Sequence, residues 1–186
     1  MKVLGVDGSG RGGGNTAVLV RAILDGAEAG GAETELLDLA GWDIHGCDAC
    51  QGCKWSRRCV IEDDMQRFYD VAPEADVLVL GSPIYLDHVT AQMMAFIQRT
   101  YCYIGPALEN YWPREGVRAV LAITYGAGDP HMYDDVLDWM AGRMKGYFEI
   151  PTVARFAIPS TAHEPIITDD HPEVARAREF GGSLAE

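Results

Sequence analysis

Apolar runs and helical patterns alternate along this chain. Five short runs rich in apolar residues predict buried strands at residues 2–7, 33–39, 76–81, 117–124 and 153–158. Apolar residues recur at helical spacing between and after these runs, and predict helices at 16–29, 63–72, about 88–104, about 131–148 and from 172 onward. Strands that alternate with helices predict a parallel sheet with helices on both faces, because right-handed crossovers place the helices there.

The number of these elements predicts a single α/β domain over residues 1–186. Five strands at this length suit a flavodoxin-like three-layer sandwich with a five-stranded parallel sheet. Ligands of such sheets bind beyond the carboxyl ends of the strands. We therefore expect functional residues in three segments that follow predicted strands, at 8–16, 82–88 and 124–129.

Composition and charge narrow the classes of partner. The chain has 186 residues, is 48% hydrophobic and carries a formal net charge of −13. This charge disfavours approach to phosphate backbones and anionic membranes, so we expect no nucleic-acid or membrane partner. The longest purely aliphatic run, residues 77–80, is far shorter than the ~20 residues of a membrane helix, and Asp7 precedes any apolar region of a signal peptide. These features predict a cytoplasmic protein.

The glycine-rich segment after the first strand matches a dinucleotide-binding pattern. Gly8, Gly10 and Gly13 satisfy the GxGxxG fingerprint. Asp38 sits near the end of the second strand, where an acid can bind a ribose. On this interpretation the ligand is NAD(P).

The same segment also suits a terminal phosphate. Ser9, Arg11, Asn15 and Thr16 can surround a phosphate dianion together with free amides at the start of the helix. A dinucleotide pyrophosphate needs close backbone approach, whereas a monophosphate benefits from such side-chain donors. We therefore favour a mononucleotide.

Two further strand ends offer contacts to a planar ring. Pro83 stiffens the turn after the third strand, the amides of Ile84 and Tyr85 can donate, and the Tyr85 ring can stack. The fourth strand ends in a segment with two glycines at 126 and 128. The residues that we expect to contact the cofactor here are Ser82, Pro83, Ile84, Tyr85, Thr124, Gly126 and Gly128.

Four of the five cysteines lie in one short segment after the second strand. Cys47, Cys50 and Cys53 are separated by two residues each, and Cys59 follows after five more. Ferredoxin-type loops hold a [4Fe-4S] cluster with closely similar spacing. Zinc sites usually pair two CxxC knuckles across a longer spacer, which this segment lacks. The spacing thus favours an iron-sulfur cluster over zinc.

In combination, these motifs resemble the iron-sulfur flavoproteins, within the wider group of NAD(P)H-dependent FMN reductases. The resemblance covers roughly residues 1–130. It is carried by Gly8-Ser9-Gly10-Arg11 with Asn15-Thr16, by the four cysteines running into Asp63-Asp64-Met65, and by Gly81-Ser82-Pro83-Ile84-Tyr85.

This resemblance implies a redox enzyme with FMN and a [4Fe-4S] cluster. It implies that Ser9, Arg11, Asn15 and Thr16 hold the FMN phosphate, that residues 82–85 contact the isoalloxazine, and that the cysteines at 47, 50, 53 and 59 bind the cluster. It also implies a homodimer or homotetramer that passes electrons between a small-molecule substrate and a ferredoxin-like protein.

Several functions remain open at this level. The flavin enzyme can be a dehydrogenase of a cyclohexadiene acid of the aminodeoxychorismate type, or an NAD(P)H-dependent reductase of flavin or quinone. Two alternatives lie outside that class. One is an electron carrier without a substrate of its own, and the other is an NAD(P)-binding protein whose cysteines bind a structural zinc ion.

The sequence departs from the family pattern after Tyr85. Asp87 and His88 replace the usual small residues, and we expect them to form an acid/base pair near the open face of the flavin, although Asp87 also suits a helix cap. Arg99, Arg114 and His131 are further candidates for binding a substrate carboxylate.

The predicted helix at 88–104 is apolar around much of its circumference. Val89, Met93, Phe96 and Ile97 lie on one face, and other apolar residues extend it sideways. This width predicts a subunit interface. We expect Cys102 on this helix to be a buried small hydrophobe without a chemical role.

Overall fold

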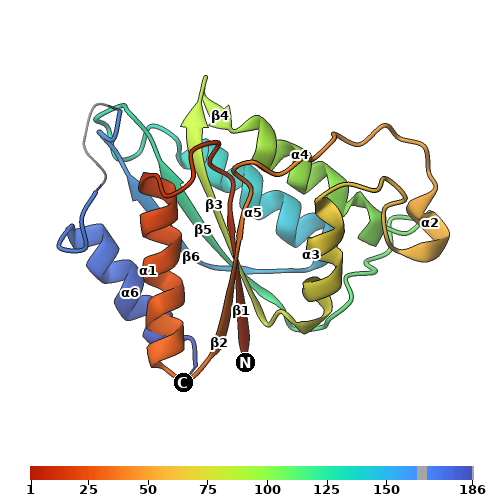
Figure 1. The fold of residues 1–186 in the computed structure, drawn as a ribbon, viewed down its shortest axis with the longest axis horizontal. Helices are drawn as coiled ribbons and strands as arrows, with labels where there is room; N and C mark the ends of the chain where they lie inside the picture. Colours follow the sequence, from red (N-terminus) through yellow and green to blue (C-terminus); the bar gives the residue numbers. More distant parts are fainter. Residues whose placement is uncertain (163–166, 186) are drawn as a thin grey trace.

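A computed structural model describes residues 1–162 and 167–185, which form a sheet between two layers of helices (Figure 1). The parallel strands lie in the order β2-β1-β3-β5-β6. Their bounds are β1 (Lys2–Asp7), β2 (Glu33–Asp38), β3 (Val77–Tyr85), β5 (Arg118–Thr124) and β6 (Thr152–Ile158). This is the flavodoxin-like order, so the predicted fold is confirmed. One strand was not predicted: β4 (His88–Val89) pairs antiparallel with the end of β3.

Each face of the sheet carries its own set of helices. On one face lie α1 (Asn15–Ala29) and α6 (Pro172–Ser183), and on the other lie α3 (Met65–Val71), α4 (Ala91–Arg99) and α5 (Asp134–Phe148) (Figure 1). Successive residues of β3 serve the two faces in turn: Val77 and Val79 pack toward α1 and α6, whereas Leu78 and Leu80 pack toward the other helices. The buried, apolar sequence of β3 follows from this double burial.

Glycines let α1 and α6 touch. A Cβ atom on Gly181 would lie 2.1 Å from the carbonyl oxygen of Ile23, and one on Gly26 would lie 2.0 Å from that of Arg178. Neither distance is sterically possible, so the close approach of the two backbones requires glycine at both positions.

The predicted helix at 88–104 begins later than expected. β3 continues to Tyr85, and the chain turns back through Leu86 and Asp87, which both have positive φ angles of 47° and 62°. Such two-residue turns connect antiparallel strands, so His88 lies in the hairpin strand β4 and not in a helix. Thr90 caps the helix: its Oγ1 accepts a hydrogen bond from the Met93 amide at 3.1 Å and donates one to the Gly8 carbonyl at 2.5 Å.

α4 ends at Arg99 and continues as a 3₁₀ turn, η2 (Thr100–Tyr103). Its apolar residues pack into the core of the same chain: Met93 and Phe96 are buried, and Met94 and Ile97 are partly buried against them. The subunit interface stays a prediction. Cys102 is 2% exposed, which confirms the expectation that it is buried, and burial raises the pKa of its thiol to about 12.

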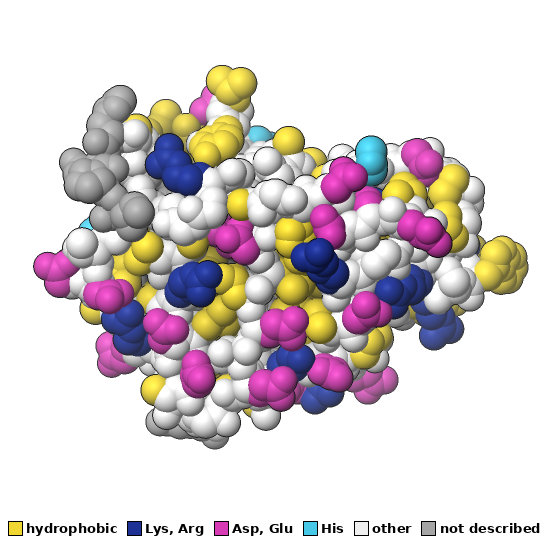
Figure 2. All heavy atoms as spheres, in the orientation of Figure 1, with side chains coloured by type: hydrophobic (Ala, Val, Ile, Leu, Met, Phe, Trp, Pro, Cys, Tyr) yellow, Lys and Arg dark blue, Asp and Glu magenta, His cyan; other side chains and the backbone are white. Residues whose placement is uncertain are grey.

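Two short elements complete the described chain: α2 (Cys53–Ser56), which lies beyond α3 at the end of the molecule, and the 3₁₀ turn η1 (Ala72–Glu74) (Figure 1). No helix in the described ranges is long and apolar enough to cross a membrane. Acidic and basic side chains are interspersed over the face seen in Figure 2.

Candidate functional site

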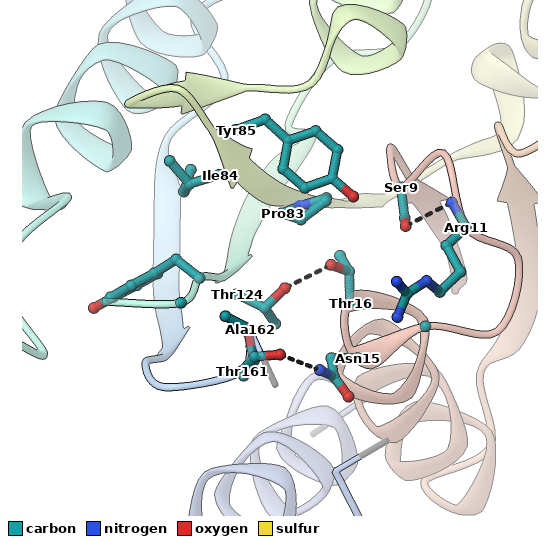
Figure 3. A pocket seen from close by; sticks show the side chains of 13 residues that line it. Ser9, Arg11, Asn15, Thr16, Pro83, Ile84, Tyr85, Thr124, Thr161 and Ala162 are labelled. Atoms are coloured by element: carbon teal, nitrogen blue, oxygen red, sulfur yellow. Dashed lines mark hydrogen bonds between the residues drawn. The ribbon is translucent and has the colours of Figure 1, made fainter. Parts of the chain in front are cut away.

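A cavity of about 290 Å³ lies at the carboxyl ends of β1, β3 and β5, where the strand order predicts a ligand (Figure 3). All three predicted segments contribute to its walls. The cavity is lined by Ser9, Arg11, Gly14, Asn15, Thr16, Pro83, Ile84, Tyr85, Thr124, Tyr125, Gly126, Thr161 and Ala162. Most of the residues that we expected to hold a cofactor therefore meet at one place.

The loop between β1 and α1 and the start of α1 form one wall. Arg11 donates its backbone amide to the Ser9 hydroxyl at 3.0 Å, and Gly13 has a φ of +68°, which favours glycine. The α1 N-terminus has no side-chain cap and no acidic residue in its first turn. Its free amides and the positive end of the helix dipole therefore form a site suited to an anion.

Asn15 and Thr16 are fixed by the neighbouring elements. Asn15 donates from Nδ2 to the Thr161 carbonyl at 3.3 Å, and the hydroxyls of Thr16 and Thr124 lie 2.8 Å apart. Figure 3 shows Asn15 and Thr16 at the start of α1, between Arg11 on one side and Thr124 and Thr161 on the other. The wall is therefore assembled by contacts between α1, β5 and the segment after β6.

The end of β3 forms the opposite wall. Pro83 and Ile84 are buried, and Tyr85 is 56% exposed with its ring at the cavity edge (Figure 3). An exposed aromatic ring beside an anion site is suited to a ligand that has both a phosphate and a planar ring.

Two residues that we expected to contact the cofactor, Ser82 and Gly128, lie outside the cavity lining. Ser82 does not line the cavity: it is fully buried, donates to the Pro83 carbonyl at 2.8 Å and accepts from the Thr90 amide at 3.1 Å. Gly128 also lies outside the lining, whereas Gly126 is part of it. A Cβ on Gly126 would lie 2.6 Å from that of Ala162, so this position has no room for a side chain.

Thr161 and Ala162 line the cavity but lie outside the three predicted segments, whereas Gly14 and Tyr125 lie within those segments without having been named individually. The amide of Thr161 donates to the Tyr125 carbonyl at 2.9 Å and so holds the segment after β6 against the end of β5. The pairing of β5 with β6 brings this segment to the site. The rule on carboxyl strand ends, extended to the last strand, would have identified it.

Asp87 and His88 do not line the cavity. Asp87 is exposed and accepts a hydrogen bond from the Tyr133 hydroxyl at 2.8 Å. The His88 ring packs edge-on against Trp139, with 4.7 Å between the ring centroids. The expected acid/base role is thus without support from the geometry and stays a prediction. Asp38, the candidate ribose ligand, also lies outside the lining.

A buried carboxylate lies beneath the loop. Asp7 is 0% exposed; its Oδ1 accepts the Ser9 amide at 3.0 Å, whereas Oδ2 has no hydrogen-bond partner among the described residues. Burial raises the pKa of Asp7 to about 6; the hydrogen bond from Ser9 opposes the rise, and Asp38 adds to it. The position therefore places a titratable acid directly under the proposed anion site.

The four clustered cysteines are all free thiols. Cys47 and Cys50 are exposed, Cys59 is half-buried and Cys53 is buried, which raises the pKa of its thiol. In the described ranges, no three histidine, cysteine or acidic side chains are gathered closely enough to hold a metal ion. The cysteines have the chemistry of a cluster-binding set, but their described arrangement does not bring them to one point, and their role as ligands stays a prediction.

The backbone of residues 47–59, here called the cysteine segment, contains a turn that is common at iron-sulfur sites. Gln51 has a positive φ of 62°, and Gly52, which follows it, is right-handed helical. Alternating left-handed and right-handed residues turn successive amides toward one concavity, as is common in iron-sulfur sites. The segment between Cys50 and Cys53 is thus compatible with an anionic cluster.

Arg99 ties both ends of the cysteine segment to α4. Its guanidinium donates to the His45 carbonyl at 2.9 Å and to the Ile61 carbonyl at 3.3 Å, and it pairs with both carboxylate oxygens of Asp63 at 2.5 and 3.0 Å. Both side chains are almost fully buried. Burial opposes ionisation of Asp63, but the hydrogen bonds from Arg99 and the backbone outweigh it and hold the pKa of this carboxyl low.

This pairing occupies the guanidinium of Arg99. Arg114 pairs with Asp76, and His131 lies 3.0 Å from Asp134 at the surface. None of the three lines the cavity. The geometry therefore gives no support for a substrate carboxylate bound by these residues at the cavity, and that role stays a prediction.

The known proteins that are similar to this chain include flavoproteins. The family model described as NADPH-dependent FMN reductase matches residues 1–155. An iron-sulfur flavoprotein of Methanocaldococcus jannaschii is 40% identical over 100 residues, which cover 54% of this chain and 52% of that protein. The chain thus spans about half of that relative. An iron-sulfur flavoprotein of Archaeoglobus fulgidus is 28% identical over 187 residues, which cover 100% of this chain and 80% of the relative.

Among solved structures, the fold is similar to that of an FMN-dependent NADH-azoreductase from Bacillus anthracis, crystallised with FMN. The TM-score is 0.72 at 13% sequence identity, and the alignment covers 100% of both chains. This likeness concerns the fold alone. The matched residues and the curated relatives together show that the chain belongs to the NADPH-dependent FMN reductase family of flavin-dependent oxidoreductases, and within it resembles the proteins named iron-sulfur flavoproteins.

Proposed function

We propose that the protein is an oxidoreductase that binds FMN in the cavity at the carboxyl ends of β1, β3 and β5, and a [4Fe-4S] cluster on the cysteine segment. One observation supports the FMN proposal most strongly. An uncapped helix N-terminus, several side-chain donors and an exposed aromatic ring all border the same cavity. A phosphate and a planar ring need these two surfaces.

The residues at the start of α1 would hold the phosphate. Ser9 and Thr16 present hydroxyls, Asn15 an amide and Arg11 the one side-chain cation of the lining. Arg11 is exposed and free of ion pairs among the described residues, so its charge is available to a dianion. The hydrogen bond between Thr16 and Thr124 orients the Thr16 hydroxyl before the ligand arrives.

The residues at the end of β3 would hold the isoalloxazine ring. Pro83 has no amide hydrogen, and its ring stiffens the backbone that carries Ile84 and Tyr85. Tyr85 would shield one side of this ring from water. Gly126 lets the segment after β6 close on the cavity, because Ala162 occupies the space that a side chain would need.

When bound, FMN supplies hydride exchange with a small molecule, and the cluster supplies single-electron exchange with a ferredoxin-like protein. The cysteine thiols at 47, 50, 53 and 59 would hold the cluster. The curated relatives named iron-sulfur flavoproteins support this proposal, as does the thiol spacing. A homodimer or homotetramer is part of the same proposal.

Binding of FMN and of riboflavin, which lacks the phosphate, tests the cavity. Flavin fluorescence is titrated with apoprotein for the parent, for Arg11→Gln and for Arg143→Gln, a charge-matched control on α5. We expect Arg11→Gln to weaken FMN about tenfold or more and to leave riboflavin unchanged, because a charge-assisted hydrogen bond contributes roughly 1.5–3 kcal/mol. Equal weakening of both ligands, or no FMN binding by the parent, would refute the proposal.

Iron and sulfide content after anaerobic reconstitution tests the cluster. We expect about four irons per chain in the parent and in Cys102→Ala, and a large loss in Cys53→Ser. Bound zinc without iron in the parent would favour the zinc alternative. Bleaching of the flavin absorption by NADPH in the absence of any protein partner would distinguish an enzyme from a pure electron carrier.

A further inference from the structure

A second cavity, of about 420 Å³, lies next to the cysteine segment and shares no residue with the first. Its volume lies within the range of small-molecule sites. Arg57 and Arg58, between Cys53 and Cys59, form one side, and aromatic residues form much of the rest. It is lined by Arg57, Arg58, Tyr69, Pro73, Tyr103, Asn110, Tyr111, Trp112 and Pro113.

The two arginines differ in their partners. Arg58 is engaged: it donates to the Gln66 side chain at 2.6 Å and pairs with Asp70 at 2.7 Å. Arg57 has no carboxylate within ion-pair distance in the part of the chain that is described, and its guanidinium lies 4.2 Å from the centre of the Tyr111 ring. The cavity therefore holds a positive charge that stacks on an aromatic ring but has no anionic partner.

The other polar side chains of the lining differ in whether they have partners: the Tyr69 hydroxyl already donates to the Arg99 carbonyl at 2.9 Å. Trp112 is 7% exposed, and its Nε1–H is buried with no hydrogen-bond partner among the described residues. Tyr103 is 4% exposed, and no partner for its hydroxyl is found in the same residues. Burial raises the pKa of Tyr103, so its hydroxyl remains a donor at neutral pH. The amide of Asn110 is already used, by the Phe148 carbonyl and the Trp112 amide.

The polar and aromatic groups of the lining define the chemistry of a matching ligand. The unpaired guanidinium of Arg57 and the free hydroxyl of Tyr103 suit an anion, and a carboxylate matches the planar fork of arginine. The walls formed by Tyr69, Tyr103, Tyr111 and Trp112 favour a flat apolar body. We propose that this cavity binds a small aromatic carboxylate, with Arg57 as the partner of its charge. The site is separate from the flavin cavity, and its cationic side belongs to the segment that carries the cysteines.

Calorimetric titration of the FMN-loaded protein with benzoate, under anaerobic conditions, tests the proposal. Benzamide keeps the ring without the charge, and acetate keeps the charge without the ring. We expect saturable benzoate binding and at least about tenfold weaker binding of each analogue. Arg57→Gln should weaken benzoate by about tenfold, whereas Arg67→Gln, the same charge change on α3 outside the cavity, should leave it unchanged.

Tyr103→Phe removes only a hydroxyl and should weaken benzoate severalfold. FMN affinity and iron content are measured for every variant, and we expect both to stay at parent levels, which separates this site from the function proposed above. Absence of benzoate binding up to about 10 mM, equal affinity for benzamide, or equal loss in Arg67→Gln would overturn the proposal.

Discussion

Replacing Asp7 by asparagine measures what a buried carboxylate costs this fold. The side chain is fully buried, one of its oxygens has no partner among the described residues, and its pKa is raised from 3.8 to about 6. This difference corresponds to ~3 kcal/mol when the group is ionised in both folded and unfolded states. Because the folded protein holds the proton more tightly, the cost is absent below about pH 4 and fully present above about pH 6.

Urea denaturation of the FMN-free protein at several pH values gives the required free energies of unfolding. We expect the gain from Asp7→Asn over the parent to grow by about 2 kcal/mol between pH 4.5 and pH 8. Asparagine can still accept the Ser9 amide, and any cost of its new amide group is independent of pH. Glu115→Gln, at an exposed position, is the control for the loss of one charge. A difference between Asp7→Asn and the parent that does not change with pH would refute the reasoning.

Two further substitutions test the packing. Arg99→Met leaves Asp63 buried without its partner and should lower the free energy of unfolding by about 3–5 kcal/mol; the double variant with Asp63→Leu should recover part of this loss, and an equal loss in both would contradict the role of the lone charge. Gly181→Ala places a Cβ against the backbone of α1 and should cost more than ~2 kcal/mol. Gly182→Ala, whose nearest neighbour is 3.7 Å away, should cost little, and thermal unfolding of the two variants compares them.

The fold could be predicted because the strands are buried on both faces and alternate with clear helical patterns. Most of the cavity could also be predicted, because its residues follow strands at the carboxyl edge. The hairpin at Leu86 and Asp87 could not, since two non-glycine residues with positive φ leave no glycine to mark the turn. Asp87 and His88 were therefore placed at the start of a helix.

Contacts between segments that are distant in the sequence explain the other residues whose positions were not predicted. Thr161 reaches the cavity only through the pairing of β5 with β6, which periodicity does not reveal. Arg99 was a candidate for binding a substrate because an arginine in a sequence has no visible partner. Its pairing with Asp63 depends on how the cysteine segment folds back over α4.

One helix connects the two proposed cofactor regions. α4 is capped by Thr90, which is bonded to the Gly8 carbonyl in the glycine-rich loop, and ends at Arg99, which holds both ends of the cysteine segment. Its nine residues span about 13 Å. α4 therefore sets a fixed distance between the anchor points of the cysteine segment and the first cavity, a distance that would stay the same if the segment rearranged to bind the proposed cluster.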